Sequence, residues 1–239
     1  MRLRERLEST GAKLIVTVVG LSLMGGVAFA ASYSPLFAAK SIAVEGAVHL
    51  STSQVLAAAG VSNGTNVLHL DTEAVAAAIE TDPWVADASI RTDPPSTIAI
   101  TITERRPLAL VGPEHEAVAP DGVVLPAARP GGLPEIQSLA GPLSSRGRRS
   151  ALEVLALMPR GLWRRVSVTT ATNDGWISLQ LRDGPRVVYG TTDDGEAKIE
   201  ALRSLLSWAE REGKELVKVD VRVPTAPAAT LAGDVALPT

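Results

Sequence analysis

The chain has 239 residues, a formal net charge of −3, 46% hydrophobic residues and no cysteine. The acidic balance argues against a nucleic-acid binder, which would need a basic surface, and the lack of cysteine excludes disulfides and zinc–thiolate sites within this sequence. High apolar content combined with low net charge predicts a folded chain rather than a disordered one.

The residues from Leu14 to Ala39 carry no charge and follow a flank with four basic and two acidic residues. As a helix, residues 14–31 would be about 27 Å long, close to the hydrocarbon thickness of a bilayer. We predict a transmembrane helix over 14–36 and, from the basic flank, a cytoplasmic tail over 1–13. A cleaved signal peptide is the alternative, because Ala28-Phe29-Ala30 fits a small-x-small cleavage site. Both interpretations export the rest of the chain.

The residues after this stretch predict a compact α+β unit. Lys40–Gly46 alternates as a short strand, and helices begin at Ser51, which forms a capping box with Gln54, and at Asp71. Two further strands are expected from the alternation of apolar and polar residues over 84–91 and 97–104. Three isoleucines of the last strand are expected to share its buried face: Ile98, Ile100 and Ile102. The order strand, helix, helix, strand, strand predicts two helices over one face of a three-stranded sheet.

The remaining residues predict a β-rich domain with flanking helices and a mostly antiparallel sheet. Turn signals such as Asn173-Asp174-Gly175 and Asp183-Gly184 separate its later strands. The tail over 225–239 is rich in Ala, Pro and Thr, and we expect it to be disordered. The expected strands are 108–111, 123–125, 165–170, 176–182, 186–189 and 216–223, and the expected helices are 148–158 and the stretch from Asp193 to Gly213.

No motif predicts catalysis or metal binding. The spacings S-x-x-K, G-x-S-x-G and G-x-x-x-x-G-K-[ST] are absent, which argues against penicillin-binding enzymes, serine hydrolases and P-loop nucleotide binders. His69 and Asp71 lack a nearby third metal ligand, and Glu114-His115-Glu116 lies in a loop rich in Pro and Gly, as expected for solvated surface. The sequence therefore predicts no catalytic residue, no metal, no cofactor and no small-molecule substrate.

The last predicted strand suggests a protein–protein contact instead. Its alternation places Val217, Val219, Val221 and Val223 on one face and Lys218, Asp220 and Arg222 on the other. If this strand is a sheet edge, its free N–H and C=O groups could accept a strand from a partner. The alternative is that the three charges only keep the edge soluble.

Several motifs resemble a POTRA domain. The resemblance is carried by Ser34–Phe37 (SPLF), Ser41–Gly46 (SIAVEG), Gly64–Leu68 (GTNVL), Asp82–Ala88 (DPWVADA) and Glu104–Pro107 (ERRP). Its motif residues are Gly46, Trp84, Val85, Glu104, Arg105 and Pro107. We therefore assign residues 37–106 to a POTRA domain and residues 107–224 to a second, β-rich domain.

An N-terminal anchor, one POTRA unit and a β-rich domain ending in Val219–Pro224 (VDVRVP) are similar to the FtsQ/DivIB family of cell-division proteins. The resemblance implies a single-pass inner-membrane protein of type II, enriched at the division septum, that links division proteins without enzymatic activity. This favours a retained anchor over a cleaved signal peptide.

The resemblance also implies FtsB- and FtsL-like partners, with an FtsB-like strand added at the last strands, here Val217 to Val223. The POTRA domain would contact further division proteins. The alternatives are a POTRA-containing component of envelope assembly or secretion, and an exported enzyme of unknown class.

Overall fold

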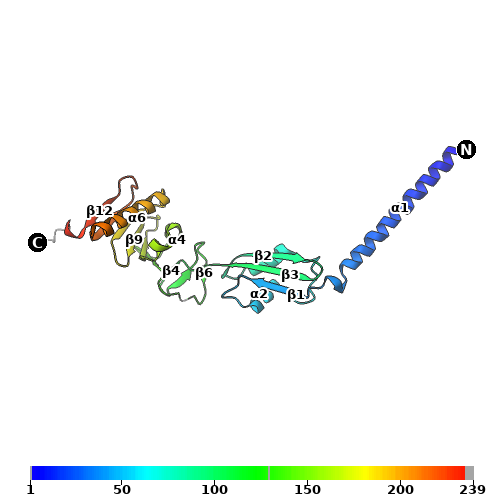
Figure 1. Cartoon of the computed structure of the whole chain (residues 1–239), viewed down its shortest axis with the longest axis horizontal. Helices are drawn as coiled ribbons and strands as arrows, with labels where there is room; N and C mark the ends of the chain where they lie inside the picture. The colour runs from blue at the N-terminus through cyan, green and yellow to red at the C-terminus, as the bar shows by residue number, and fades with distance from the viewer. Residues whose placement is uncertain (1, 129, 235–239) are drawn as a thin grey trace. The chain divides into compact units, whose positions relative to one another are not determined.

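The computed structural model describes residues 2–128 and 130–234, with side chains from Val16 to Gly233. The chain forms two compact units, residues 1–104 and residues 105–239 (Figure 1). The first unit starts with a long helix, α1 (Arg2–Ser32), and a 3-10 turn, η1 (Pro35–Phe37), capped by the Ser34 hydroxyl. Among the residues that the structure describes, no helix combines the length and the apolar character that a membrane crossing requires.

The remainder of the first unit has the predicted order of elements. It consists of β1 (Ser41–Glu45), α2 (Thr52–Ala59), α3 (Thr72–Ile79), β2 (Val85–Asp93) and β3 (Thr97–Glu104). In the sheet, β3 lies between the other two strands, parallel to β1 and antiparallel to β2. The predicted α+β fold and element order of this unit are confirmed.

Local signals explain why these elements form where they do. The Ser51 hydroxyl accepts a hydrogen bond from the Gln54 amide and the Gln54 side chain accepts one from the Ser51 amide, which is the predicted capping box. Asp71 caps α3 by accepting from the Ala74 amide. The three isoleucines of β3 are buried in a core shared with Val55 and Ile79. Capping and alternation therefore agree with the packing.

The carboxylate of Glu104, at the end of β3, holds the turn of residues 48–50 that connects β1 to α2. Its Oε1 accepts hydrogen bonds from the amides of Val48 at 2.7 Å and His49 at 2.8 Å, and its Oε2 lies 2.7 Å from His49 Nδ1. The His49 ring stacks on Trp84 with centroids 4.0 Å apart. Burial alone would raise the pKa of Glu104, but these hydrogen bonds outweigh it and the pKa lies below its ordinary value.

Acidification is therefore expected to destabilise the first unit through Glu104. Its lowered pKa means that its contribution to stability is present above the unfolded-state pKa and is lost as the pH falls through the lower folded-state pKa. The Glu104→Gln variant should be less stable at pH 7 and less sensitive to acid. Urea unfolding of the full chain, followed by hydrogen exchange of β3 amides, measures both effects.

Glu45→Gln is the matched control, since Glu45 is exposed on β1 of the same unit, and it should keep the acid sensitivity of the unmodified chain. Equal acid sensitivity in Glu104→Gln and the unmodified protein would contradict the assignment.

The other motif residues of this region lie around the same turn or lead out of it. Gly46 has φ +84°, a left-handed conformation that follows β1 directly. Val85 is fully buried at the start of β2. Arg105 donates from Nε to Asp121 Oδ2 at 2.6 Å within the second unit, and Pro107 precedes the next strand. The first-unit members of the motif thus lie together at one end of the three-stranded sheet.

The second unit contains one nine-stranded sheet in the order β12-β11-β10-β9-β8-β7-β4-β5-β6. Within the described residues its neighbours are antiparallel except for β4–β7, β7–β8 and β10–β11, so the predicted mostly antiparallel sheet is confirmed. Its strands are β4 (Ala109–Val111), β5 (Glu116–Val118), β6 (Val124–Leu125), β7 (Glu135–Ser138), β8 (Val166–Ala171), β9 (Ile177–Leu181), β10 (Arg186–Gly190), β11 (Leu216–Asp220) and β12 (Ala228–Leu231). Its helices are α4 (Ser145–Leu157), α5 (Arg160–Trp163), α6 (Gly195–Glu212) and the 3-10 turn η2 (Ala232–Asp234).

The core of this unit lies where α4 and α6 pack on the sheet. The helices contact β7, β8, β9 and β11 and one another. Leu155 of α4 and Leu202 of α6 are buried together with Leu179 of β9. Tyr189 of β10 is fully buried, and burial raises its pKa to about 12. Lys198 is also buried, and its Nζ donates to the Thr191 carbonyl at 3.0 Å.

One expectation for the C-terminal part is wrong. We expected residues 225–239 to be disordered, but Ala228–Leu231 form β12 and Ala232–Asp234 form a 3-10 turn. The strand is short, and its sequence, AATL, shows no alternation of apolar and polar residues from which a strand could be predicted. It is a strand because it pairs with β11. Residues 235–239 lie outside the part of the chain that the structure describes.

Candidate functional site

The C-terminal edge of the nine-stranded sheet is formed by β12 and not by β11. A turn in which the Ala226 amide donates to the Val223 carbonyl at 3.0 Å reverses the chain, and β12 then pairs antiparallel with β11. The expectation that Leu216–Val223 is the free edge is therefore wrong, because the next segment of the chain covers it. The outermost strand of the sheet at this end is β12.

The burial of residues 216–223, which comprise β11 and the three residues after it, follows the predicted alternation only in part. Val219 and Val221 are fully buried, as expected, but Val217 is 44% and Val223 is 57% exposed. The pairing with β12 shifts register between Leu216 and Lys218, which inserts one extra residue into β11. Leu216 and Val219 can both face the core for this reason, and Val217 is left outside.

The backbone of β12 presents hydrogen-bonding groups on its outer side. The Ala232 amide donates to the Glu215 carbonyl at 3.0 Å, so it points toward β11. Because backbone groups alternate sides along an antiparallel strand, those of Thr230 and Ala228 also point inward, and those of Leu231 and Ala229 point outward. The outward N–H and C=O groups of Ala229 and Leu231 are thus the ones with which another strand could pair.

Two of the three charges predicted for the last strand bind each other: Asp220, the last residue of β11, and Arg222, which follows it. Arg222 Nε lies 2.9 Å from Asp220 Oδ1, and Arg222 Nη2 lies 2.6 Å from Asp220 Oδ2. This hydrogen-bonded pair holds the pKa of Asp220 below its ordinary value. The guanidinium also lies 6.0 Å from the ring centroid of Trp176. The pair braces the end of β11, while Lys218 stands on the open face of the sheet.

Lys218 lines a hollow on the face of the sheet opposite to the helices. Its register partner on β10 is Arg186, so two cations stand side by side. Exposed Trp176 and Leu139 border the same hollow, whose other lining residues include Thr170, Ser178 and Val188. Trp176 and Leu139 were not predicted as contact residues: Trp176 is the first residue of the expected strand 176–182, and Leu139 directly follows β7, which was not expected. Trp176 lies beside Arg222, so the hollow extends the candidate contact surface from the end of β11 across β10, β9 and β8 toward the end of β7.

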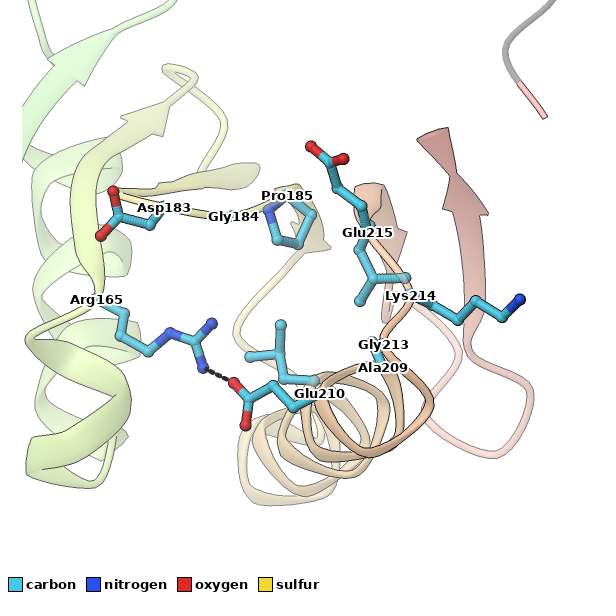
Figure 2. A pocket seen from close by; sticks show the side chains of 11 residues that line it. Arg165, Asp183, Gly184, Pro185, Ala209, Glu210, Gly213, Lys214 and Glu215 are labelled. Atoms are coloured by element: carbon cyan, nitrogen blue, oxygen red, sulfur yellow. Dashed lines mark hydrogen bonds and ion pairs between the residues drawn. The ribbon is translucent and has the colours of Figure 1, made fainter. Parts of the chain in front are cut away.

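A second pocket, of about 420 Å³, lies at the C-terminal end of α6 (Figure 2). Arg165, which immediately precedes β8, donates to Glu210 of α6 at 2.8 Å across it. Asp183, Lys214 and Glu215 extend from its rim. The ion pair ties α6 to the start of β8, so we assign this pocket a structural role.

Two family models match the chain. The model described as "POTRA domain, FtsQ-type" matches residues 37–105, and the model described as "Cell division protein FtsQ/DivIB, C-terminal" matches residues 109–222. The second match includes β11 and ends before β12.

Curated relatives carry the name "Cell division protein FtsQ". The protein from Streptomyces bingchenggensis is 32% identical over 232 residues, which are 91% of this chain and 85% of the relative. Those from Mycobacteroides abscessus and Mycobacterium tuberculosis H37Rv are 31% and 33% identical, over 84% of this chain and 66% and 65% of the relatives. The chain thus spans about two thirds of the length of these mycobacterial relatives.

Proposed function

Since the chain belongs to the FtsQ/DivIB family of cell-division proteins, we propose that it is a non-enzymatic scaffold of the division complex in the bacterial cytoplasmic membrane. In this role it binds FtsB- and FtsL-like partners through its extracytoplasmic part. It links early and late division proteins at the septum, and its POTRA domain contacts further members of the complex.

The observation that carries the proposal is the open outer side of β12. Strand addition needs a sheet edge whose N–H and C=O groups are free to pair, and Ala229 and Leu231 point theirs outward. Buried Val219 of β11 and buried Val221, just after it, support this edge from within. The contact role expected of Val217 to Val223 therefore extends to the β11–β12 hairpin, with Val217, Lys218, Arg222 and Val223 as its exposed side chains.

Membrane anchoring is part of the proposal and is supported by the sequence around α1. The stretch Leu14–Ala39 is uncharged, and the basic residues before it favour a cytoplasmic N-terminus. A scaffold that must meet membrane-bound partners gains from such an anchor, because tethering raises the local concentration of its binding surfaces. The intact mass of the mature protein separates a retained anchor from a signal peptide cleaved after Ala30.

Depletion of the protein in its source bacterium tests the proposed role. Cells are expected to grow as filaments, and a fluorescently tagged copy should restore division and gather at midcell. A tagged copy that carries Ala229→Pro, and so lacks one outward amide of β12, should restore division poorly. Normal division after depletion, with a tagged copy spread evenly over the envelope, would rule out the scaffold role.

A further inference from the structure

The end of α1 is fastened to the loop between α2 and α3. The Ser32 hydroxyl lies 2.8 Å from Nε2 of His69, and Asn66 Nδ2 donates to the Ser32 carbonyl at 2.8 Å. The Tyr33 ring stacks on the His69 ring with centroids 4.2 Å apart and planes at 13°. The last turn of the helix and a loop 37 residues further along the chain thus form one continuous surface within the first unit.

Around this joint the protein exposes an apolar surface, which we call the helix-end patch: Phe29, Tyr33, Leu36, Leu68 and His69. Phe29 is 63%, Tyr33 and Leu36 are 58% and Leu68 is 43% exposed. Asn66 Oδ1 accepts from the Leu68 amide at 2.9 Å and from the His69 amide at 3.2 Å, so the loop is held with Leu68 outside. Exposed apolar groups gathered in this way mark a binding surface.

The charges around the helix-end patch indicate what it binds. Neither residues 14–39 nor residues 61–70 contain a single Asp, Glu, Lys or Arg. The first charge after α1 is Lys40, which is exposed and has no ion pair among the described residues. The nearest carboxylate along the loop, Asp71, is engaged in capping α3. The patch itself is therefore uncharged, and it is bordered by the cation of Lys40 on one side and by the helix-capping carboxylate of Asp71 on the other.

This combination fits the interface of a phospholipid bilayer. Aromatic rings with a polar group, such as Tyr and His, favour the headgroup level, where one side is apolar and the other is wet. A lysine beside them can reach the anionic phosphates while its stem stays near apolar groups. A water-facing surface would gain nothing from placing Leu68 outside next to Tyr33.

We propose that the helix-end patch rests in the extracytoplasmic interface of the membrane, with Leu68 and the Tyr33–His69 stack at the headgroups and Lys40 at the phosphates. The inference rests on the proposed anchor and adds a second, loop-mediated lipid contact to it. The POTRA unit is thereby held against the bilayer by the α2–α3 loop. The opposite end of its sheet, with Val48 and Glu104, stays in water, since β1 leads away from Lys40 toward that end.

The lack of cysteine allows a direct test on the full chain. Leu68→Cys and the control Val48→Cys each introduce a single thiol for a nitroxide label, and Val48 is 82% exposed at the far end of the same unit. The labelled proteins are placed in vesicles of phosphatidylethanolamine and phosphatidylglycerol. Collision rates are then measured with oxygen, which concentrates in the bilayer, and with a nickel chelate, which stays in water.

The label at position 68 is expected to collide severalfold more with oxygen than with the chelate, and the label at position 48 to show the reverse. Leu36→Cys, on the α1 side of the patch, should behave like Leu68→Cys and guards against a local effect of one label. Vesicle-bound protein whose label at 68 is as open to the chelate as that at 48 would overturn the lipid contact and leave the anchor intact.

Two other outcomes also count against the proposal. Protein that does not float with the vesicles would overturn the anchor and the lipid contact together. Shielding of position 68 in detergent-free protein without vesicles would assign the patch to a protein contact instead.

Discussion

Replacing Ala229 by proline is expected to weaken the binding of an FtsB-like peptide about tenfold or more while the second unit stays folded. Proline removes the outward amide of Ala229 and places its ring where the incoming strand would lie. The inward amides of Ala228 and Thr230 keep the ladder to β11. Edge strands tolerate proline on their outer side, so the change acts on binding and not on folding.

Two neighbouring substitutions provide the controls for this effect. Ala229→Val keeps the amide and should bind like the unmodified protein, whereas Thr230→Pro removes an inward amide and should loosen the β11–β12 hairpin itself. Calorimetric titration with a peptide from the FtsB-like partner of the same bacterium measures affinity, and hydrogen exchange of β11 reports hairpin integrity. Unchanged affinity in Ala229→Pro would refute strand addition at β12.

Replacing Gly46 by alanine is expected to lower the free energy of unfolding of the POTRA unit by about 4 kcal/mol, or to prevent its folding. Gly46 has φ +84°, and the left-handed region costs an ordinary residue about 1–2 kcal/mol. A Cβ at this position would also overlap the carbonyl oxygen of Ile102 in β3. The backbone would have to move apart beside the Glu45–Thr101 pair, and this strain adds to the conformational cost.

Gly60 provides a matched control for this substitution. It also has a positive φ, +62°, as the C-cap of α2, but a Cβ there meets nothing within 4 Å. Gly60→Ala should therefore cost about 1 kcal/mol, the conformational part alone. Urea unfolding of the full chain with hydrogen exchange of β3 measures both variants, and equal costs would show that close approach to Ile102 is unimportant.

The POTRA unit could be predicted from the sequence because its signals are local. Ser51 and Asp71 mark the helix starts by side chains that bond to amides three residues away. The isoleucines of β3 alternate over a strand with one buried face, so the pattern alone assigns its inner side. Fold class and element order follow from such short-range regularities.

Only the approximate position of the candidate site could be predicted from the sequence. The valine alternation located β11. The bulge that exposes Val217, however, depends on the pairing of β11 with β12, and the sequence AATL does not predict β12 as a strand. β7 was not predicted for a similar reason. Its four residues form a strand because they pair with two parallel neighbours, β4 and β8, and this pairing is not visible in a local pattern. The joint between Tyr33 and His69 joins distant segments, which no local pattern reveals.

The parallel pairing of β1 with β3 has a mechanical consequence. The chain enters the POTRA unit at the start of β1 and leaves it at the end of β3. A pull between these points would slide the two strands along each other, so the five register pairs from Ser41–Thr97 to Glu45–Thr101 would share the load at once. An antiparallel hairpin pulled at its open end would instead separate rung by rung. The unit is therefore suited to carry tension applied along the chain between the start of β1 and the end of β3.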